Sequence, residues 1–114
     1  MSVGLTDPLT VVQTFERIKT AHDGLDALVN NAGTCFMPDF PHISPEELEK
    51  QMAFNFNSTF YCCQQAVQLM LERERIKEIV NISSNGAYNF DVFDPPHYRA
   101  SMTAMDTLTK DFAR

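Results

Sequence analysis

Basic residues are scarce in this sequence. Only nine of its 114 residues are Lys or Arg, against 15 Asp or Glu, so the formal net charge is −6 and the isoelectric point is near 4.8. Since contacts to phosphate need clustered Lys and Arg, this balance argues against nucleic acids and anionic membranes as partners. A run of 18 apolar residues is also lacking, as is the basic and apolar start of a secretory signal, so we expect no membrane span.

Cysteine is limited to three copies, Cys35, Cys62 and Cys63. The number is odd, two of the three are adjacent, and their spacing does not suit a metal site. We therefore expect reduced thiols, no bound metal and a cytoplasmic protein.

Enough apolar residues remain, at 44% of the chain, to build one small core. A chain of this length holds one domain at most. We therefore treat residues 1–114 as a single unit.

The run from Leu25 to Val29 is apolar except for Asp26, and Asn30-Asn31-Ala32-Gly33 follows it. Its length and composition predict a strand buried on both faces, as in a parallel sheet flanked by helices. The Asn and Gly residues then form a turn at the carboxyl end of the strand, where α/β sheets bind ligands. Without further signals, an ordinary strand and turn would be the favoured interpretation.

Two helix starts are clear. Asp7 is expected to cap a helix that Pro8 opens, with an apolar face formed by Val11, Val12, Phe15 and Ile18, and Gly24 marks its end. Ser44-Pro45-Glu46-Glu47 is a capping box, and the apolar pattern after it predicts a helix over 45–72. Residues 54–59 in its middle are poor helix formers, so we expect a kink there.

The remaining pattern predicts a strand at 79–83 and a last helix at 95–113. Asp94 is expected to cap this helix and Pro95 to open it, with Met102, Met105, Leu108 and Phe112 on its apolar face. The order of elements favours an α/β fold in which strands 25–30 and 79–83 pair in parallel through helix 45–72. A third strand at 1–6 is a weaker expectation.

Four of these segments together resemble the short-chain dehydrogenase/reductase family. They are Leu28 to Gly33 after a strand, Asn55 within a helix, Ile79 to Ser84 on the next strand, and Tyr98 opening a helix. They occur in the family's order and extend over Thr6–Arg114. The resemblance implies the central portion of a Rossmann-type, doubly wound parallel sheet.

The same resemblance implies site residues. Tyr98 would exchange a proton with the oxygen of an alcohol or carbonyl substrate, Ser84 would hold that oxygen, and Asn55 would hold a water in the proton path. Asn31, Ala32, Gly33 and Tyr98 would contact NAD or NADP. Without the family, Ser84 is a turn serine, Tyr98 a helix-start tyrosine and Asn55 a helix amide bonded to a neighbouring carbonyl.

The sequence departs from the family pattern in two respects. Four residues after the tyrosine the family has a lysine, whose charge favours the phenolate, and here that position is Met102. Arg99 follows Tyr98 directly and points about 100° away from it around the helix, and Lys110 lies roughly 18 Å further along. Neither is an obvious substitute for the family's lysine. The four glycines form no glycine-rich turn for a pyrophosphate, and the chain is about half the family's domain length.

Three interpretations of function follow. The chain is an NAD(P)-dependent alcohol or carbonyl oxidoreductase, a degenerate member that acts through association, or a truncated product without an independent role. Oxidoreductase-like is the best assignment of kind, and inactivity is the better prediction for the isolated chain. Helices 45–72 and 95–113 are the predicted surfaces of a homo-oligomer, and an unpaired strand edge favours association.

Overall fold

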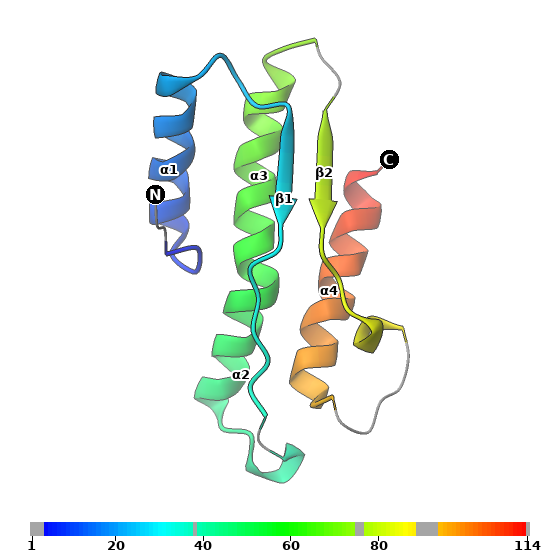
Figure 1. Cartoon of the computed structure of the whole chain (residues 1–114). Helices are drawn as coiled ribbons and strands as arrows, with labels where there is room; N and C mark the ends of the chain where they lie inside the picture. The colour runs from blue at the N-terminus through cyan, green and yellow to red at the C-terminus, as the bar shows by residue number, and fades with distance from the viewer. Residues whose placement is uncertain (1–3, 38, 75–76, 89–93, 114) are drawn as a thin grey trace.

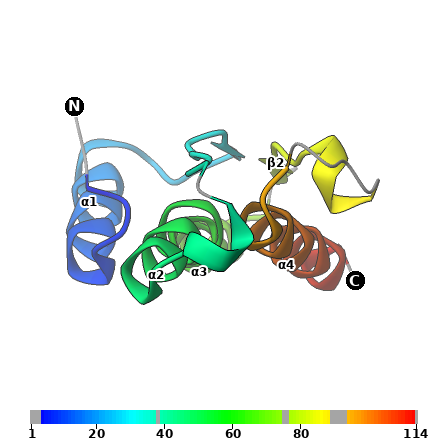
Figure 2. The same cartoon turned by 90° about the horizontal axis from the view of Figure 1, so that it is seen from below.

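The computed structural model describes residues 4–37, 39–74, 77–88 and 94–113. Two parallel strands form a small sheet, and helices α1 (Pro8–Ala21), α3 (Ser58–Leu71) and α4 (Pro96–Phe112) all lie on one of its faces (Figures 1 and 2). The α/β architecture expected from the sequence is therefore confirmed. With a single helical layer, the molecule is a slab of 48 × 27 × 18 Å.

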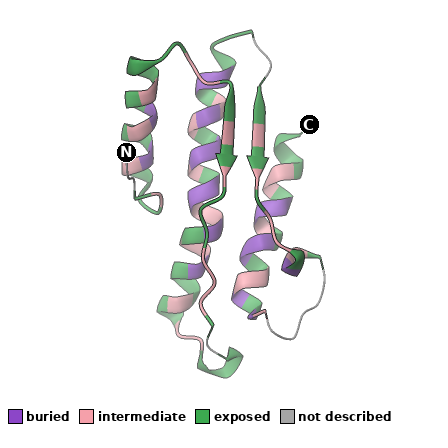
Figure 3. Cartoon of the chain, viewed as in Figure 1, coloured by how far each residue is buried: buried purple, intermediate pink, exposed green. Residues whose placement is uncertain are grey.

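The sheet pairs β1 (Ala27–Asn30) with β2 (Glu78–Asn81) in parallel, in a register that sets Leu28 beside Ile79 and Asn30 beside Asn81. The parallel pairing is as predicted, although each strand is shorter than expected. The prediction that the first strand is buried on both faces is wrong. Its residues alternate between exposed and half-buried, and Val29 exposes 61% of its surface, because helices cover only one face (Figure 3).

Helix α1 begins as predicted, since the Asp7 carboxylate accepts a hydrogen bond from the Leu9 N–H at 3.1 Å. Its apolar face is narrower than expected: Val11 and Phe15 are buried, whereas Val12 is exposed. The predicted strand at 1–6 is not formed by Gly4 to Thr6, where Leu5 and Thr6 make a turn into α1. Met1 to Val3 lie outside the described residues.

The predicted helix 45–72 consists of α2 (Pro45–Met52), a π-helical turn (Ala53–Asn57) and α3. The capping box is present, with Ser44 and Glu47 bonded to each other's backbone N–H at 3.1 and 3.0 Å. The π turn coincides with the predicted kink. Its geometry is shown by the Ser58 N–H, which bonds to the Ala53 carbonyl five residues earlier.

Helix α4 begins one residue later than predicted. Pro95 is the N-cap, Pro96 is the first helical residue, and no side chain caps the helix, so the assignments of Asp94 as cap and Pro95 as opener are wrong. The Asp94 carboxylate instead lies close to Gly86, whose missing side chain leaves it room. Pro95 and Pro96 are both suited to the first position of a helix, so the sequence alone did not decide which of them begins α4.

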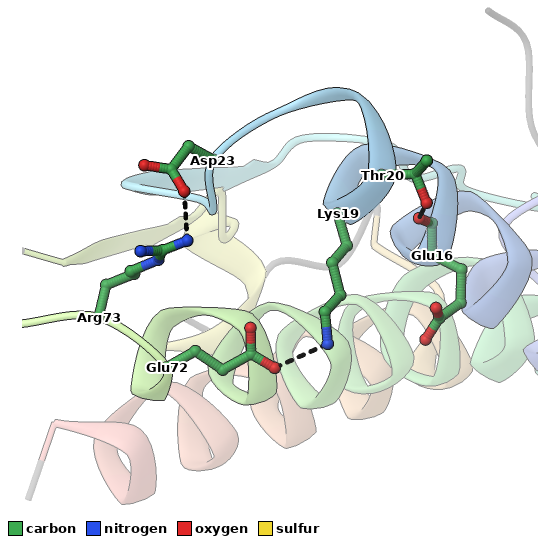
Figure 4. Close-up of polar contacts among 6 residues, drawn as sticks. All are labelled: Glu16, Lys19, Thr20, Asp23, Glu72 and Arg73. Atoms are coloured by element: carbon green, nitrogen blue, oxygen red, sulfur yellow. Dashed lines mark hydrogen bonds and ion pairs between the residues drawn. The ribbon is translucent and has the colours of Figure 1, made fainter.

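The core lies between α1, α3 and the covered face of the sheet. It is formed by Val11, Phe15, Cys62, Ala66, Leu69 and Met70, with Leu28 and Ile79 packed against it from the strands. At the rim, Lys19 pairs with Glu72 at 2.9 Å and Asp23 pairs with Arg73, so the end of α1 is tied to the end of α3 (Figure 4). Within the described residues, no helix is long and apolar enough to cross a membrane.

Candidate functional site

Asn55 is the centre of a buried hydrogen-bond network beside the carboxyl end of β1. Its Oδ1 accepts the Thr34 N–H at 2.7 Å, and its Nδ2 donates to the Thr34 carbonyl at 2.8 Å and to Ser101 Oγ at 3.1 Å. Ser101 in turn donates to the Tyr98 carbonyl at 2.7 Å. The π turn thus links the segment after β1 to the first turns of α4.

Gln51 supports the same segment one turn earlier on the helix. Its Nε2 donates to the Thr34 carbonyl at 2.7 Å and its Oε1 accepts the Phe36 N–H at 3.0 Å, while the residue is fully buried. Sequence reasoning missed Gln51. The sequence offered one signal for it: Gln51 lies four residues before Asn55, and residues at that spacing share one helix face.

Gly33 is held close to this amide pair. A Cβ at Gly33 would lie only 3.0 Å from Asn55 Oδ1, so a larger residue would displace the amide. Asn31, Ala32 and Gly33 are otherwise exposed at the sheet edge.

Ser84 caps the short 3-10 turn that follows β2 (Asn85–Ala87), and its Oγ accepts the Gly86 N–H at 3.1 Å. Arg99 Nε donates to the Gly86 carbonyl at 3.1 Å, which fastens this turn to α4. The structure therefore brings the Ser84 turn and the helix of Tyr98 together through Arg99. Capping this turn is a structural role for Ser84 that requires no catalytic function.

Tyr98 is half-buried in the first turn of α4, and Met102, one turn later, exposes 8% of its surface. Met102 is therefore a core residue rather than an open cleft position. Arg99, the nearest cation in sequence, is bonded to Gly86. The position of the family's lysine therefore holds an uncharged side chain.

His97 is a second buried polar residue at this end of α4 that sequence reasoning missed. It exposes 4% of its surface, and neither ring nitrogen has a hydrogen-bond partner. Burial lowers its pKa, because the imidazolium loses its water, and the Glu47 carboxylate opposes the shift. Its neutral form therefore packs between α2 and α4.

The starts of α1 and α2 do not suit a pyrophosphate. A carboxylate already occupies the start of α1, where Asp7 accepts the Leu9 N–H, and α2 begins with Glu46 and Glu47. These negative charges repel phosphate at the positions where helix N–H groups would otherwise bind it. Residues 31–33 are exposed but supply neither a positive charge nor a glycine-rich turn, so the described residues do not fit a whole NAD(P) molecule.

Comparison with known proteins gives one consistent family. The sequence model described as short chain dehydrogenase matches residues 1–114. A 3alpha-hydroxysteroid dehydrogenase of Mediterraneibacter gnavus is 33% identical in an alignment of 113 residues that covers 96% of this chain and 43% of that protein. A 3-oxoacyl-[acyl-carrier-protein] reductase of Aquifex aeolicus is 29% identical over 114 residues, covering 100% of this chain and 45% of the reductase.

Solved structures agree with this comparison. The ligand-free aldohexose dehydrogenase of Thermoplasma acidophilum superposes with a TM-score of 0.92 at 27% identity, covering 99% of this chain and 44% of that one. The chain therefore spans less than half the length of the relatives it matches.

Proposed function

Because this chain belongs to the short chain dehydrogenase family, we propose that it is a catalytically incomplete unit of an NAD(P)-dependent alcohol or carbonyl oxidoreductase. The Asn55 network carries this proposal, since it joins the segment after β1 to the helix of Tyr98 through five polar contacts of Asn55 and Gln51. Both amides thereby hold the segment after β1, and Asn55 also reaches Ser101 on α4.

In the proposed chemistry, the Tyr98 hydroxyl exchanges a proton with the substrate oxygen and the Ser84 hydroxyl holds that oxygen by a hydrogen bond. Asn55 fixes the segment after β1 and the start of α4 relative to each other. Met102 is the defect in this arrangement, because it offers no charge to assist proton loss from the phenol. The isolated chain is therefore inactive under this proposal.

Association with further polypeptide is part of the same proposal. The α2–α3 surface leaves Leu48, Phe54 and Phe60 exposed, and α4 leaves Phe112 exposed. Apolar side chains of this size on helix surfaces suit subunit contacts. The three thiols are free, as expected for the cytoplasmic location that we propose.

The test is calorimetric titration of the folded chain with NAD⁺, NADH, NADP⁺ and NADPH. We expect no binding at physiological cofactor concentrations, because carboxylates lie at the starts of α1 and α2 and the sequence has no glycine-rich turn. Circular dichroism of the same sample establishes that the chain is folded. A dissociation constant in the low micromolar range would overturn the proposal and restore the complete-enzyme interpretation.

A further inference from the structure

An apolar groove lies between α3, β2 and α4. It has a volume of about 500 Å³, which is within the range of small-molecule sites. Its apolar walls are formed by Val67, Met70 and Leu71 of α3, Ile79 of β2, and Phe112 and Ala113 at the end of α4. These walls can remove an aliphatic chain from water.

The groove carries one charge, the ammonium group of Lys77. No carboxylate is among the described residues that line it, and neither ion pair found in the described part of the chain involves Lys77. Successive strand residues point to opposite faces, so Glu78 at the start of β2 lies on the uncovered face with Val80. The groove is therefore positive at Lys77, although the net charge of the protein is −6.

The charged and the uncharged polar groups stand at opposite ends of the groove. Lys77 directly precedes β2, and the start of β2 lies toward the same end of the sheet as the C-terminal ends of α3 and α4 (Figure 1). At the other end, Asn81 Nδ2 donates to Thr109 Oγ1 at 2.9 Å, and Asn81 Oδ1 accepts from Asn30 Nδ2 at 2.8 Å. These hydrogen bonds join β2 to α4 and to β1, so they limit the length of the groove.

We propose that this groove binds an unbranched aliphatic carboxylate of about ten carbons, with the carboxylate on Lys77 and the chain directed toward Asn81. The strand advances by about 13 Å from Lys77 to Asn81, and an extended chain of about ten carbons has a similar length. A charge-assisted hydrogen bond from the ammonium group holds the carboxylate, and the apolar walls accept the methylenes. Neither Ser84 nor Tyr98 lines the groove, so this site is separate from the proposed dehydrogenase chemistry.

Chain length gives the first test, by calorimetric titration of the folded chain with hexanoate, octanoate, decanoate and dodecanoate. Each added methylene up to decanoate should tighten binding by about threefold, because it leaves water for the apolar walls. Dodecanoate should gain little over decanoate, since the Asn81–Thr109 hydrogen bond closes the groove. Affinity that keeps rising through dodecanoate, or a lack of saturable decanoate binding, would refute the proposal.

The head group gives the second test. Decyltrimethylammonium has an aliphatic chain like that of decanoate but the opposite charge. General adsorption to this acidic protein favours the cation, whereas a groove with Lys77 at one end favours the carboxylate. We expect decanoate to bind more tightly by about tenfold or more. A preference for the cation would overturn the assignment.

Two matched charge reversals locate the site. Lys77→Glu puts a carboxylate at the end of the groove and should weaken decanoate binding by about tenfold or more. Lys50→Glu makes the same change at an exposed position of α2 outside the groove and should bind as the parent does. Circular dichroism establishes that both variants are folded, and equal binding by the two would refute the proposal. Since no cofactor enters these titrations, their result is independent of the NAD(P) titration.

Discussion

Met102 shows how one residue ties the fold to the proposed loss of activity. The side chain is buried, so it contributes to the packing of α4 as well as replacing the lysine of the family pattern. A lysine placed there would bring its charge into a site with 8% exposure. The same position therefore cannot be restored to a cation without a cost to stability.

We predict that Met102→Lys lowers the free energy of unfolding by about 2 kcal/mol, because burial disfavours the ammonium. Urea denaturation measures the change. Ala100→Lys, at an exposed position of the same helix, is the control and should be close to neutral. A Met102→Lys protein as stable as the parent would mean that the ammonium reaches water or the Tyr98 hydroxyl. Activity could then be sought in a complex of this variant with the further polypeptide that the proposal requires.

His97 gives a prediction about acid. Its pKa in the folded chain lies below the ordinary value of 6.5, so between these two values the unfolded chain binds more protons than the folded one. The stability that the neutral His97 contributes is complete above pH 6.5. It is lost as the pH falls toward the pKa of His97 in the folded chain. Thermal melting followed over this range should show a falling melting temperature on acidification.

The His97→Leu variant, which cannot be protonated, should flatten this dependence, whereas His22→Gln at the exposed end of α1 should leave it unchanged. Parent and His97→Leu curves of equal slope would show that another group causes the acid sensitivity. Glu47 is the group to examine next, because its carboxylate acts on His97 from α2.

At the scale of elements, the start of a helix could be predicted from the sequence where a side chain caps it. Asp7 and Ser44 cap the helices as predicted, because short polar side chains bond to nearby backbone N–H groups. The start of α4 was misplaced because no side chain caps it. Strand burial was misjudged for another reason: an apolar run such as 25–29 indicates a strand, but whether a second helical layer covers it depends on distant parts of the fold.

The candidate site was readable only in part. Asn55, Ser84 and Tyr98 stand out through resemblance. The structure places Asn55 against the segment after β1, Ser84 in the turn after β2 and Tyr98 in the first turn of α4. Their roles in catalysis remain predictions. The roles of Gln51, Arg99 and His97 were missed. The spacing of Gln51 from Asn55 was a usable local signal, whereas the bond of Arg99 to Gly86 and the burial of His97 depend on segments distant in the sequence.

The capping box of α2 yields the prediction at this scale. Ser44→Ala removes the Oγ that accepts the Glu47 N–H, and it should cost about 1 kcal/mol of stability in urea denaturation. Because α2 carries Gln51, the Phe36 amide should also exchange faster. Glu49→Ala, on the exposed surface of α2, is the control; if it had the same effect, the loss could not be assigned to the cap.

At the scale of the whole molecule, the slab is too thin to bury both of its broad faces. The smallest extent is 18 Å, and apolar side chains are exposed on the sheet, at Val29 and Val80, and on the helical layer, at Phe54 and Phe60. Exposed apolar groups on both faces favour association over a stable monomer.

We therefore predict that the purified chain self-associates at micromolar concentration, with sedimentation velocity giving an average mass above 12.9 kDa. Val80→Thr and Phe60→Gln each make one face more polar, so the variant that lowers the average mass more identifies the face involved. A single cooperative monomer across the micromolar range would contradict the prediction and the open architecture on which it rests.

The π turn between α2 and α3 has a consequence for how related sequences must be compared. A bond from the Ser58 N–H to the Ala53 carbonyl encloses one residue more than a regular α-helical bond does. The wide turn absorbs this extra residue, so deleting one residue from 53–57 would restore regular α-helical winding without rotating Gln51 relative to α3. Relatives that have a regular helix and keep both amides on the loop after β1 must therefore differ from this chain in length there, which places an alignment gap inside a helix.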